Sequence, residues 1–217
     1  MNKIQIIDNN TLLYYKPNIF NKSELDAIYY WVNNQSFKNG TSIDGRIIPR
    51  KQIWFQLEQK YFNPYWKNRY PRWESEQYTD FLLELQEKIK IKTNNIINII
   101  NKETNSNYKI PQLNSCLINK YEDGTHSIAP HRDCSDSFGL TPTILAFSIG
   151  TKRELIFKNK KDNKNKEDIK KKYSFELDNN SIFIMAGNSQ NNFTHEIKKE
   201  ANCSGIRYSF TFREFIL

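Results

Sequence analysis

The chain has 217 residues, enough for one domain with a sizeable hydrophobic core. Lysine and arginine number 32 against 24 aspartate and glutamate residues, which gives a formal net charge of +8. This surplus favours a polyanionic partner, although a soluble basic protein without such a partner would have the same composition. Aromatic residues make up 14% of the sequence and argue against a disordered chain.

The cysteines and the N-terminus bear on the cellular compartment. Cys116, Cys134 and Cys203 are odd in number and unevenly spaced, so we expect no disulfide framework. The first residues lack the apolar stretch of a signal peptide, and no apolar run is long enough to cross a membrane. We therefore expect a soluble intracellular protein, cytoplasmic or nuclear, that is monomeric and has no membrane partner.

The first half of the chain predicts two helices separated by an irregular segment. Ser23 and Asp26 have the spacing of a capping box, and an apolar stripe continues to Val32. A second helix is expected after Thr79. Residues 48–73 contain three prolines and many aromatic residues without clear periodicity, which indicates short strands and loops.

From about residue 112 onward the pattern changes to short strands separated by glycine-containing turns. Many short strands with glycine turns indicate a double-sheet β-sandwich or jelly roll, so the fold class is α+β. Lys158–Lys172 is nearly all lysine, asparagine and acidic residues and predicts a solvated hairpin loop. The expected strands are Ser115–Tyr121, Ser127–Asp133, Thr143–Ile149, Glu154–Lys158, Tyr173–Leu177, Ser181–Met185, His195–Ile197 and Ile206–Arg213.

Two histidines and an aspartate are candidate metal ligands. In a strand, the two-residue period would place His131 and Asp133 on one face. With His195 from a distant strand they would form a facial triad, which leaves positions open on ferrous iron for a co-substrate and O₂. A lone His-x-Asp is weak evidence, because such pairs are common on surfaces. Cys134 would point to the opposite face of a regular strand and is assigned no ligand role.

The last strand alternates between polar and aromatic residues. Arg207 and Arg213 fall on its polar face, where they could bind both carboxylates of a small diacid. A half-exposed strand alone would also explain the alternation. Asn119 and Tyr121 share one face of the 115–121 strand and could complete the diacid pocket.

Together these motifs resemble the AlkB family of nucleic-acid dioxygenases. The segments that carry the resemblance are IPRKQIWF (48–55), LINKYEDG (117–124), IAPHRD (128–133), FSIG (147–150), IFIMAGNSQNNFTHEI (182–197) and RYSFTFRE (207–214). They lie in order along the chain, so their joint occurrence is far more specific than the triad alone.

The resemblance implies a double-stranded β-helix (jelly-roll) core with N-terminal helices and a substrate lid. It implies one domain, with residues 1–110 as the helices and nucleotide-recognition lid and 111–217 as the catalytic core. The cofactors would be Fe(II), 2-oxoglutarate and O₂. Residues matching the family's metal ligands are His131, Asp133 and His195, and those matching its 2-oxoglutarate ligands are Asn119, Tyr121, Arg207 and Arg213.

The substrate would be a flipped or single-stranded base, because a base inside a duplex cannot reach such a pocket. Several relatives carry a carboxylate that contacts this base one or two positions after the metal aspartate. Here Cys134 and Ser135 take those positions, so Ser135 becomes the base-contacting candidate and a preference for 1-methyladenine and 3-methylcytosine is in doubt. The lid candidates are Trp54, Phe55, Tyr61, Tyr65 and Trp66 for stacking, with some expected to be core, and Arg46, Arg50, Lys51 and Lys60 for phosphates.

Three functions remain open from the sequence. The leading hypothesis is an oxidative demethylase that repairs N-alkylated bases of the 1-methyladenine and 3-methylcytosine type in DNA or RNA. A second is an RNA N6-methyladenosine demethylase, and a third is a nucleic-acid-binding relative with an inactive site. The complete triad and both arginines argue against the third.

Overall fold

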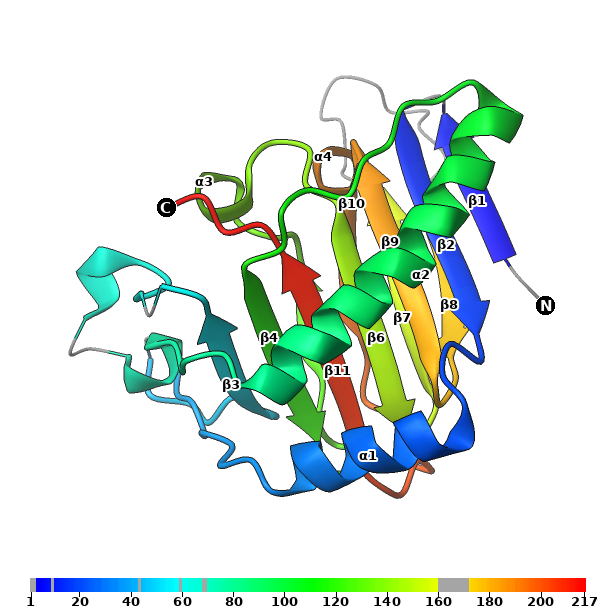
Figure 1. Ribbon diagram of the computed structural model, residues 1–217. Helices are drawn as coiled ribbons and strands as arrows, with labels where there is room; N and C mark the ends of the chain where they lie inside the picture. Colours follow the sequence, from blue (N-terminus) through cyan, green and yellow to red (C-terminus); the bar gives the residue numbers. More distant parts are fainter. Residues whose placement is uncertain (1–2, 9, 43, 59, 68–69, 160–171) are drawn as a thin grey trace.

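The computed structural model describes residues 3–8, 10–42, 44–58, 60–67, 70–159 and 172–217. Two antiparallel β-sheets pack face to face, and two long helices cover the outer face of the larger sheet (Figure 1). These helices are α1 (Lys22–Asn33) and α2 (Asp80–Thr104). The α+β class and the double-sheet jelly-roll core predicted from the sequence are confirmed.

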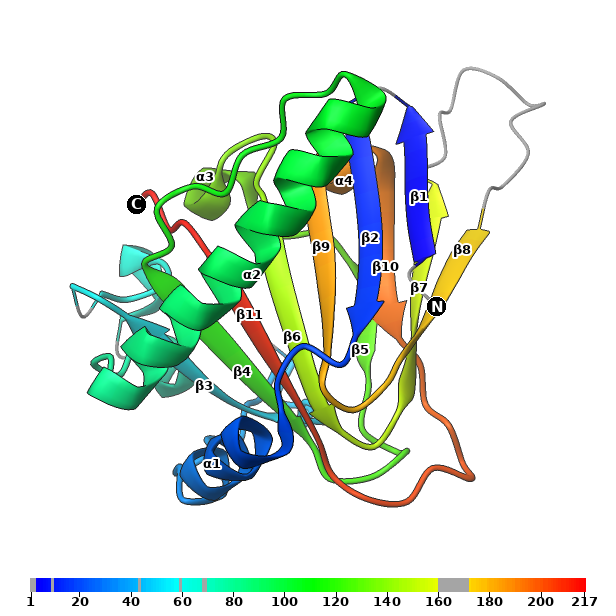
Figure 2. The ribbon, with the colours of Figure 1, turned by 45° about the vertical axis from the view of Figure 1, so that its right-hand side comes forward.

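The larger sheet has seven strands in the order β1-β2-β9-β6-β11-β4-β3, and the smaller has four in the order β5-β10-β7-β8. In the view of Figure 2 the smaller sheet lies behind the larger one. The strands are β1 (Lys3–Asp8), β2 (Thr11–Pro17), β3 (Lys51–Gln56), β4 (Ser115–Tyr121), β5 (Ile128–His131), β6 (Ile144–Gly150), β7 (Arg153–Asn159), β8 (Lys172–Leu177), β9 (Ser181–Gly187), β10 (Phe193–Ile197) and β11 (Arg207–Arg213).

The eight strands predicted after residue 112 are all present, but the N-terminal strands β1 and β2 were not predicted. In β2, Leu12 and Tyr14 pack toward the helices while Leu13 and Tyr15 pack between the sheets. A strand buried on both faces shows no alternation of polar and apolar residues, so the two-residue period was missing.

Both predicted helices form, with one correction at a terminus. Thr79 caps α2 as predicted, since its side chain accepts a hydrogen bond from the backbone N–H of Leu82. The capping box of α1 uses Asn21 and Glu24, two residues before the predicted pair. Asparagine accepts a hydrogen bond from the helix N–H groups as well as serine does, so the earlier residue can be the cap.

Two main layers of side chains form the core. The outer layer packs both helices onto the larger sheet and includes Ile28, Leu85 and Phe210. The inner layer fills the space between the sheets, where the rings of Phe157 and Phe183 stack with centroids 5.5 Å apart. This inner layer fills one end of the sandwich, and the other end holds a cavity lined by both charged and apolar side chains.

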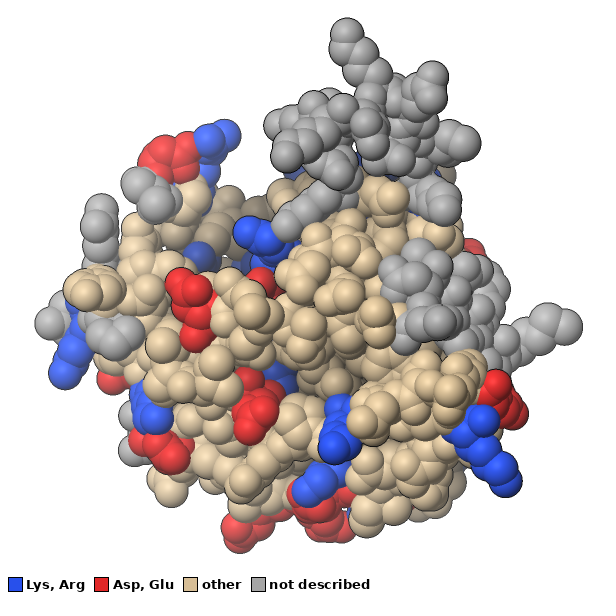
Figure 3. Space-filling model, turned by 90° about the horizontal axis from the view of Figure 1, so that it is seen from above, with Lys and Arg blue, Asp and Glu red and all other residues tan. Residues whose placement is uncertain are grey.

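The short helical elements lie at the cavity end or beside it: η1 (Pro64–Trp66), η2 (Pro71–Trp73), α3 (Ser135–Phe138) and α4 (Ser189–Asn192). The predicted solvated loop within Lys158–Lys172 falls mostly on residues 160–171, which lie outside the described residues. Among the described residues, no helix combines the length and apolarity needed to span a membrane. Seen from above, acidic and basic side chains are interspersed over the described surface (Figure 3).

Candidate metal and co-substrate site

A cavity of about 590 Å³ lies between the two sheets. Strands from both sheets and residues of the 48–73 segment line it. Its volume is in the range of pockets that bind small molecules.

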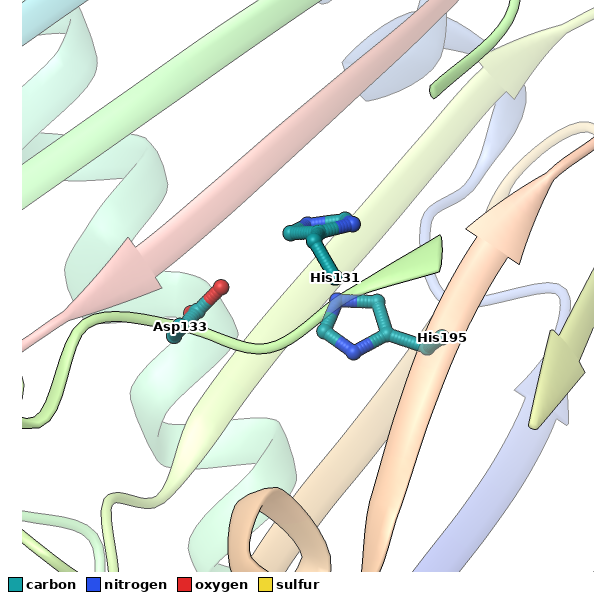
Figure 4. Close-up of side chains that lie close together, drawn as sticks. All are labelled: His131, Asp133 and His195. Atoms are coloured by element: carbon teal, nitrogen blue, oxygen red, sulfur yellow. The ribbon is translucent and has the colours of Figure 1, made fainter. Parts of the chain in front are cut away.

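The three candidate metal ligands meet in this cavity (Figure 4). His131 ends β5 and pairs directly with His195 on β10, which brings the ring centroids to 4.3 Å. Asp133 follows the end of β5, and one ligand atom from each of the three residues lies within 4.8 Å of the others. Two imidazoles and one carboxylate at this spacing suit the open facial coordination of ferrous iron.

The histidines are held in the form that a metal needs. His131 Nδ1 lies 3.0 Å from the carbonyl oxygen of Ala129, and a carbonyl only accepts, so Nδ1 carries the proton and Nε2 is free to coordinate. Burial lowers the pKa of His131, and the charge of Asp133 opposes this shift. Burial and then the charge of His131 lower the pKa of His195 to about 3. Both rings are therefore neutral near pH 7.

Asp133 is fixed from two sides. Arg213 Nη1 donates a hydrogen bond to Asp133 Oδ2 over 2.9 Å. The backbone N–H of Asp133 donates to Gln190 Oε1 over 3.0 Å. Burial opposes ionisation of Asp133, but the charge of Arg213, joined by His195 and His131 at a pH low enough to protonate them, outweighs burial and lowers the pKa of Asp133. The aspartate is thus a preformed anion directed at the metal position.

Strand β11 supplies the two arginines predicted to bind a diacid. Arg207 and Arg213 line the cavity, whereas Tyr208, Phe210 and Phe212 pack into the outer core, as the alternation predicted. Arg207 is 2% exposed, and Arg213 is 5% exposed.

Some N–H groups of these arginines are buried and have no partner among the described residues, and they indicate what kind of ligand fits the site. Arg207 Nη2 donates to Ser148 Oγ over 2.8 Å, while Arg207 Nε and Nη1 and Arg213 Nε have no partner among the described residues. Leaving a buried charged donor unsatisfied is costly, so these N–H groups fit a ligand that carries carboxylates. The donor set therefore fits 2-oxoglutarate.

The two further co-substrate candidates also line the cavity. The Tyr121 ring lies between two guanidinium groups, with Arg207 Cζ 5.2 Å and Arg153 Cζ 5.7 Å from its centroid. Asn119 is 6% exposed, and its Oδ1 accepts a hydrogen bond from Arg50 Nε over 2.9 Å. The structure brings all four residues together, and their roles as ligands stay predictions.

The predicted lid residues need corrections. Arg50 lines the cavity and contacts Asn119, so it is placed for contact with a bound molecule inside rather than with phosphates outside. Lys51 pairs with Glu122 over 2.8 Å and does not line the cavity.

Trp54 belongs to the hydrophobic core. It is 1% exposed and packs edge-on against Phe62 and Phe215, with centroids 5.4 and 5.1 Å away, so stacking on a base would require the core to open. The assignment of Trp54 as a substrate contact is therefore wrong for this conformation. Trp66 is half-buried, stacked on Phe62 at 5.7 Å, and outside the cavity lining.

The residues after the metal aspartate also differ from expectation. Because β5 ends at His131, strand alternation does not extend to Cys134, which lines the cavity. Ser135 begins α3, is exposed and does not line the cavity, so its predicted base contact is absent from this conformation.

The cavity wall also includes residues that were not singled out from the sequence, among them Phe62, Trp73, Phe138 and Arg132. Phe62 and Trp73 come from the irregular aromatic segment, where no periodicity indicated a direction. Arg132 lies between two metal-ligand candidates, and that position was the only available signal for it.

The sequence matches the 2OG-Fe(II) oxygenase superfamily over residues 12–213. Among curated proteins it is 30% identical over 118 residues to DNA oxidative demethylase ALKBH2 of Arabidopsis thaliana, covering 47% of this chain and 38% of that protein. It is 29% identical over 103 residues to alpha-ketoglutarate-dependent dioxygenase alkB homolog 3 of Homo sapiens, covering 46% of this chain and 36% of that protein. These matches span well under half of the relatives' lengths.

Solved structures share the fold. OsALKBH1 superposes with a TM-score of 0.66 at 15% identity, covering 98% of this chain and 100% of that one. A prolyl hydroxylase of Trichoplax adhaerens, in complex with a peptide fragment, superposes with a TM-score of 0.57 at 14% identity. The match covers 94% of this chain and 83% of that one.

The chain belongs to the 2OG-Fe(II) oxygenase superfamily, and its resemblance to the AlkB family is confirmed by these relatives. The expected dioxygenase class, with Fe(II), 2-oxoglutarate and O₂ as cofactors, is confirmed at the level of this superfamily.

Proposed function

We propose that the protein oxidatively demethylates N-alkylated bases in DNA or RNA, as in the repair of alkylation damage, and releases formaldehyde, succinate and CO₂. One observation carries this proposal. A single cavity contains the His131, Asp133 and His195 cluster, the Arg207 and Arg213 pair, and a wall from the lid segment. Bound iron and 2-oxoglutarate together activate O₂ and supply the oxidant.

The residues of this chain then have distinct tasks. His131, Asp133 and His195 hold the metal, and Gln190 and Arg213 keep Asp133 in position. Arg207 and Arg213, with Asn119 and Tyr121, bind the two carboxylates of 2-oxoglutarate. The apolar wall formed by Phe62, Trp73 and Phe138 excludes water and receives the methylated base.

The base enters from a single strand or after flipping. Tyr65 lies in the lid segment and is 90% exposed, so it replaces Trp54 as the stacking candidate for a neighbouring base. The nucleic-acid partner, the monomeric state and the intracellular location stay predictions.

A second candidate is demethylation of N6-methyladenosine in RNA. It is favoured by Cys134 and Ser135, which stand where several relatives carry a carboxylate for the base. An inactive binding protein is disfavoured by the assembled metal cluster and the buried arginine donors without partners.

The test is formaldehyde release from oligonucleotides of one sequence that carry 1-methyladenine, 3-methylcytosine or N6-methyladenine as single-stranded DNA, duplex DNA and RNA. Release that requires both Fe(II) and 2-oxoglutarate supports a demethylase, and the substrate ranking separates the two candidates. Binding of all oligonucleotides without formaldehyde release would favour the inactive relative.

A further inference from the structure

The charges that line the cavity restrict which methylated base it accepts, provided that the proposed demethylase function holds. Among the described residues of the lining, four are arginines (Arg50, Arg132, Arg207 and Arg213), and Asp133 is the acidic one. The positions of the 43–73 segment that fall outside the described residues are Ile43, Gln59, Asn68 and Arg69, none of which is acidic.

Cofactor binding does not change the excess of positive over negative charge in the cavity lining. Ferrous iron and 2-oxoglutarate carry equal and opposite charges, so the pair adds none. Asp133 is already paired with Arg213 over 2.9 Å and directed at the metal position. No carboxylate of the described lining is therefore left to pair with a positively charged base.

The aromatic wall offers a cationic base little compensation. Cations bind favourably over aromatic faces, but guanidinium groups already lie beside two of these rings. Arg213 Cζ lies 4.3 Å from the centroid of Phe138, and Arg72 Cζ lies 5.3 Å from that of Trp73. The third ring, Phe62, packs against Trp54, Trp66, Trp73, Phe138 and Phe215.

Arg50 is the arginine placed to meet the base. It lies in the segment that leads into β3 and lines the cavity, and the bond from its Nε to Asn119 fixes the guanidinium plane. Arg207 and Arg213 are assigned to the co-substrate, and Arg132 is exposed. The two terminal nitrogens of Arg50 can only donate hydrogen bonds, so they match carbonyl oxygens and ring acceptors.

We infer that this cavity selects uncharged N-methylated bases with an acceptor edge, of the 3-methyluracil or 3-methylthymine class, over cationic bases such as 3-methylcytosine, and that Arg50 sets this selection. In 3-methyluracil the methylated nitrogen lies between two carbonyl groups. One atom of O₂ enters a methyl C–H bond and the other enters succinate as 2-oxoglutarate loses CO₂. The C–N bond of the hydroxymethyl group then breaks, its electron pair stays on N3, the hydroxyl proton is transferred to N3, and formaldehyde leaves.

The matched pair of probes is 3-methyluracil and 3-methylcytosine, placed at one position of otherwise identical single-stranded DNA. The two bases share the ring and the N3-methyl group and differ at position 4, where a carbonyl replaces an amino group, and in net charge. The readout is kcat/KM for demethylation by the iron-loaded protein with 2-oxoglutarate, measured by mass spectrometry. We expect a preference for 3-methyluracil of roughly tenfold or more, because like charges in a partly dehydrated cavity repel strongly.

Variants of Arg50 test whether this residue causes the preference for 3-methyluracil. Arg50→Gln should reduce the ratio of the two kcat/KM values roughly tenfold, whereas Arg50→Lys, which retains the charge, should keep most of it. Arg46→Gln removes the same charge from an exposed position of the segment, where the side chain is 84% exposed. Any effect of Arg46 on phosphate contacts would change both substrates alike, so its ratio should stay at the wild-type value.

The outcomes separate this inference from the proposed function. Demethylation of both bases with equal rates, or with 3-methylcytosine preferred, would overturn the inference and leave the demethylase standing. A wild-type preference for 3-methyluracil that survives unchanged in Arg50→Gln would overturn the role of Arg50. If neither base is demethylated, the inference is overturned. If the 1-methyladenine and N6-methyladenine oligonucleotides also release no formaldehyde while 2-oxoglutarate is still consumed, the proposed function fails with it. The ratio of the two kcat/KM values in the wild-type protein tests the selection for uncharged bases even if an Arg50 variant does not fold.

Discussion

Arg207 is nearly fully buried, yet among the residues that the structure describes only its Nη2 has a hydrogen-bond partner, Ser148 Oγ. A carboxylate of 2-oxoglutarate would satisfy the remaining N–H groups. In Arg213, Nη1 donates to Asp133 Oδ2, and Nε has no hydrogen-bond partner in the described part of the chain. Arg213 is therefore shared between the predicted metal ligand Asp133 and the predicted co-substrate site, and β11 carries it on the sheet opposite the histidine pair.

Arg207→Ala should raise the 2-oxoglutarate concentration for half-maximal turnover roughly tenfold to hundredfold, because a charged hydrogen bond contributes about 1.5–3 kcal/mol. Arg207→Lys should recover part of the affinity, since a point charge cannot reproduce the planar fork. Ser148→Ala, which removes only the protein partner of Arg207, is the matched control and should have a smaller effect. Steady-state 2-oxoglutarate consumption measures all three, and an unchanged requirement in Arg207→Ala would place the co-substrate elsewhere.

At the scale of elements, the segment between Ile48 and Trp73 divides into buried and exposed aromatic residues. Trp54→Ala should lower the free energy of unfolding by about 3–5 kcal/mol and depress 2-oxoglutarate turnover and nucleic-acid demethylation together, as loss of a core side chain does. Tyr65→Ala should leave stability unchanged and weaken oligonucleotide binding roughly tenfold or more, since a base stacked on an aromatic ring contributes about 1–3 kcal/mol.

Urea unfolding followed by circular dichroism and oligonucleotide titration separate these two effects. The assignment of the two residues would be reversed if Tyr65→Ala unfolded more readily while Trp54→Ala lost only oligonucleotide binding.

The elements show where sequence reasoning succeeded and where it lacked a signal. The strands after residue 112 could be predicted because glycine turns bound them, and because in β11 the aromatic face packs on the core while the polar face lines the cavity. The His131, Asp133 and His195 cluster was also predicted, although Asp133 lies beyond the strand. In β3 the interior residues are buried on both faces, so alternation could not distinguish Trp54 in the core from a residue that contacts substrate.

At the scale of the whole molecule, the buried histidines make stability depend on pH. The ordinary histidine pKa of 6.5 applies to His195 in the unfolded chain, and burial lowers it to about 3 in the folded protein. Between these values the unfolded chain binds more protons, so the free energy of unfolding falls as the pH falls. The lowered pKa of Asp133 acts in the same direction at the acidic end.

We therefore expect the metal-free protein, prepared with a chelator, to lose stability steadily as the pH falls below about 6.5. His195→Gln removes one of the titrating groups and should flatten this dependence. Urea unfolding at a series of pH values measures both slopes. Equal slopes for the wild type and His195→Gln would show that His195 does not resist protonation in the folded protein.

The surface and the cavity together indicate where recognition takes place. Acidic and basic side chains are interspersed over the described surface seen in Figure 3, whereas arginines outnumber acidic residues among the described charged residues that line the cavity. We therefore expect the charged residues of the cavity to contribute to substrate choice.

The most direct test of the central claim is iron-dependent consumption of 2-oxoglutarate by Asp133→Ala, compared with Asp136→Ala. Both variants remove one acidic side chain, but Asp136 is exposed on α3 and outside the cavity lining. We expect Asp133→Ala to bind iron weakly and to produce no succinate, and Asp136→Ala to bind iron and turn over like the wild type. Full succinate production by Asp133→Ala with added iron would show that His131, Asp133 and His195 are not the metal site.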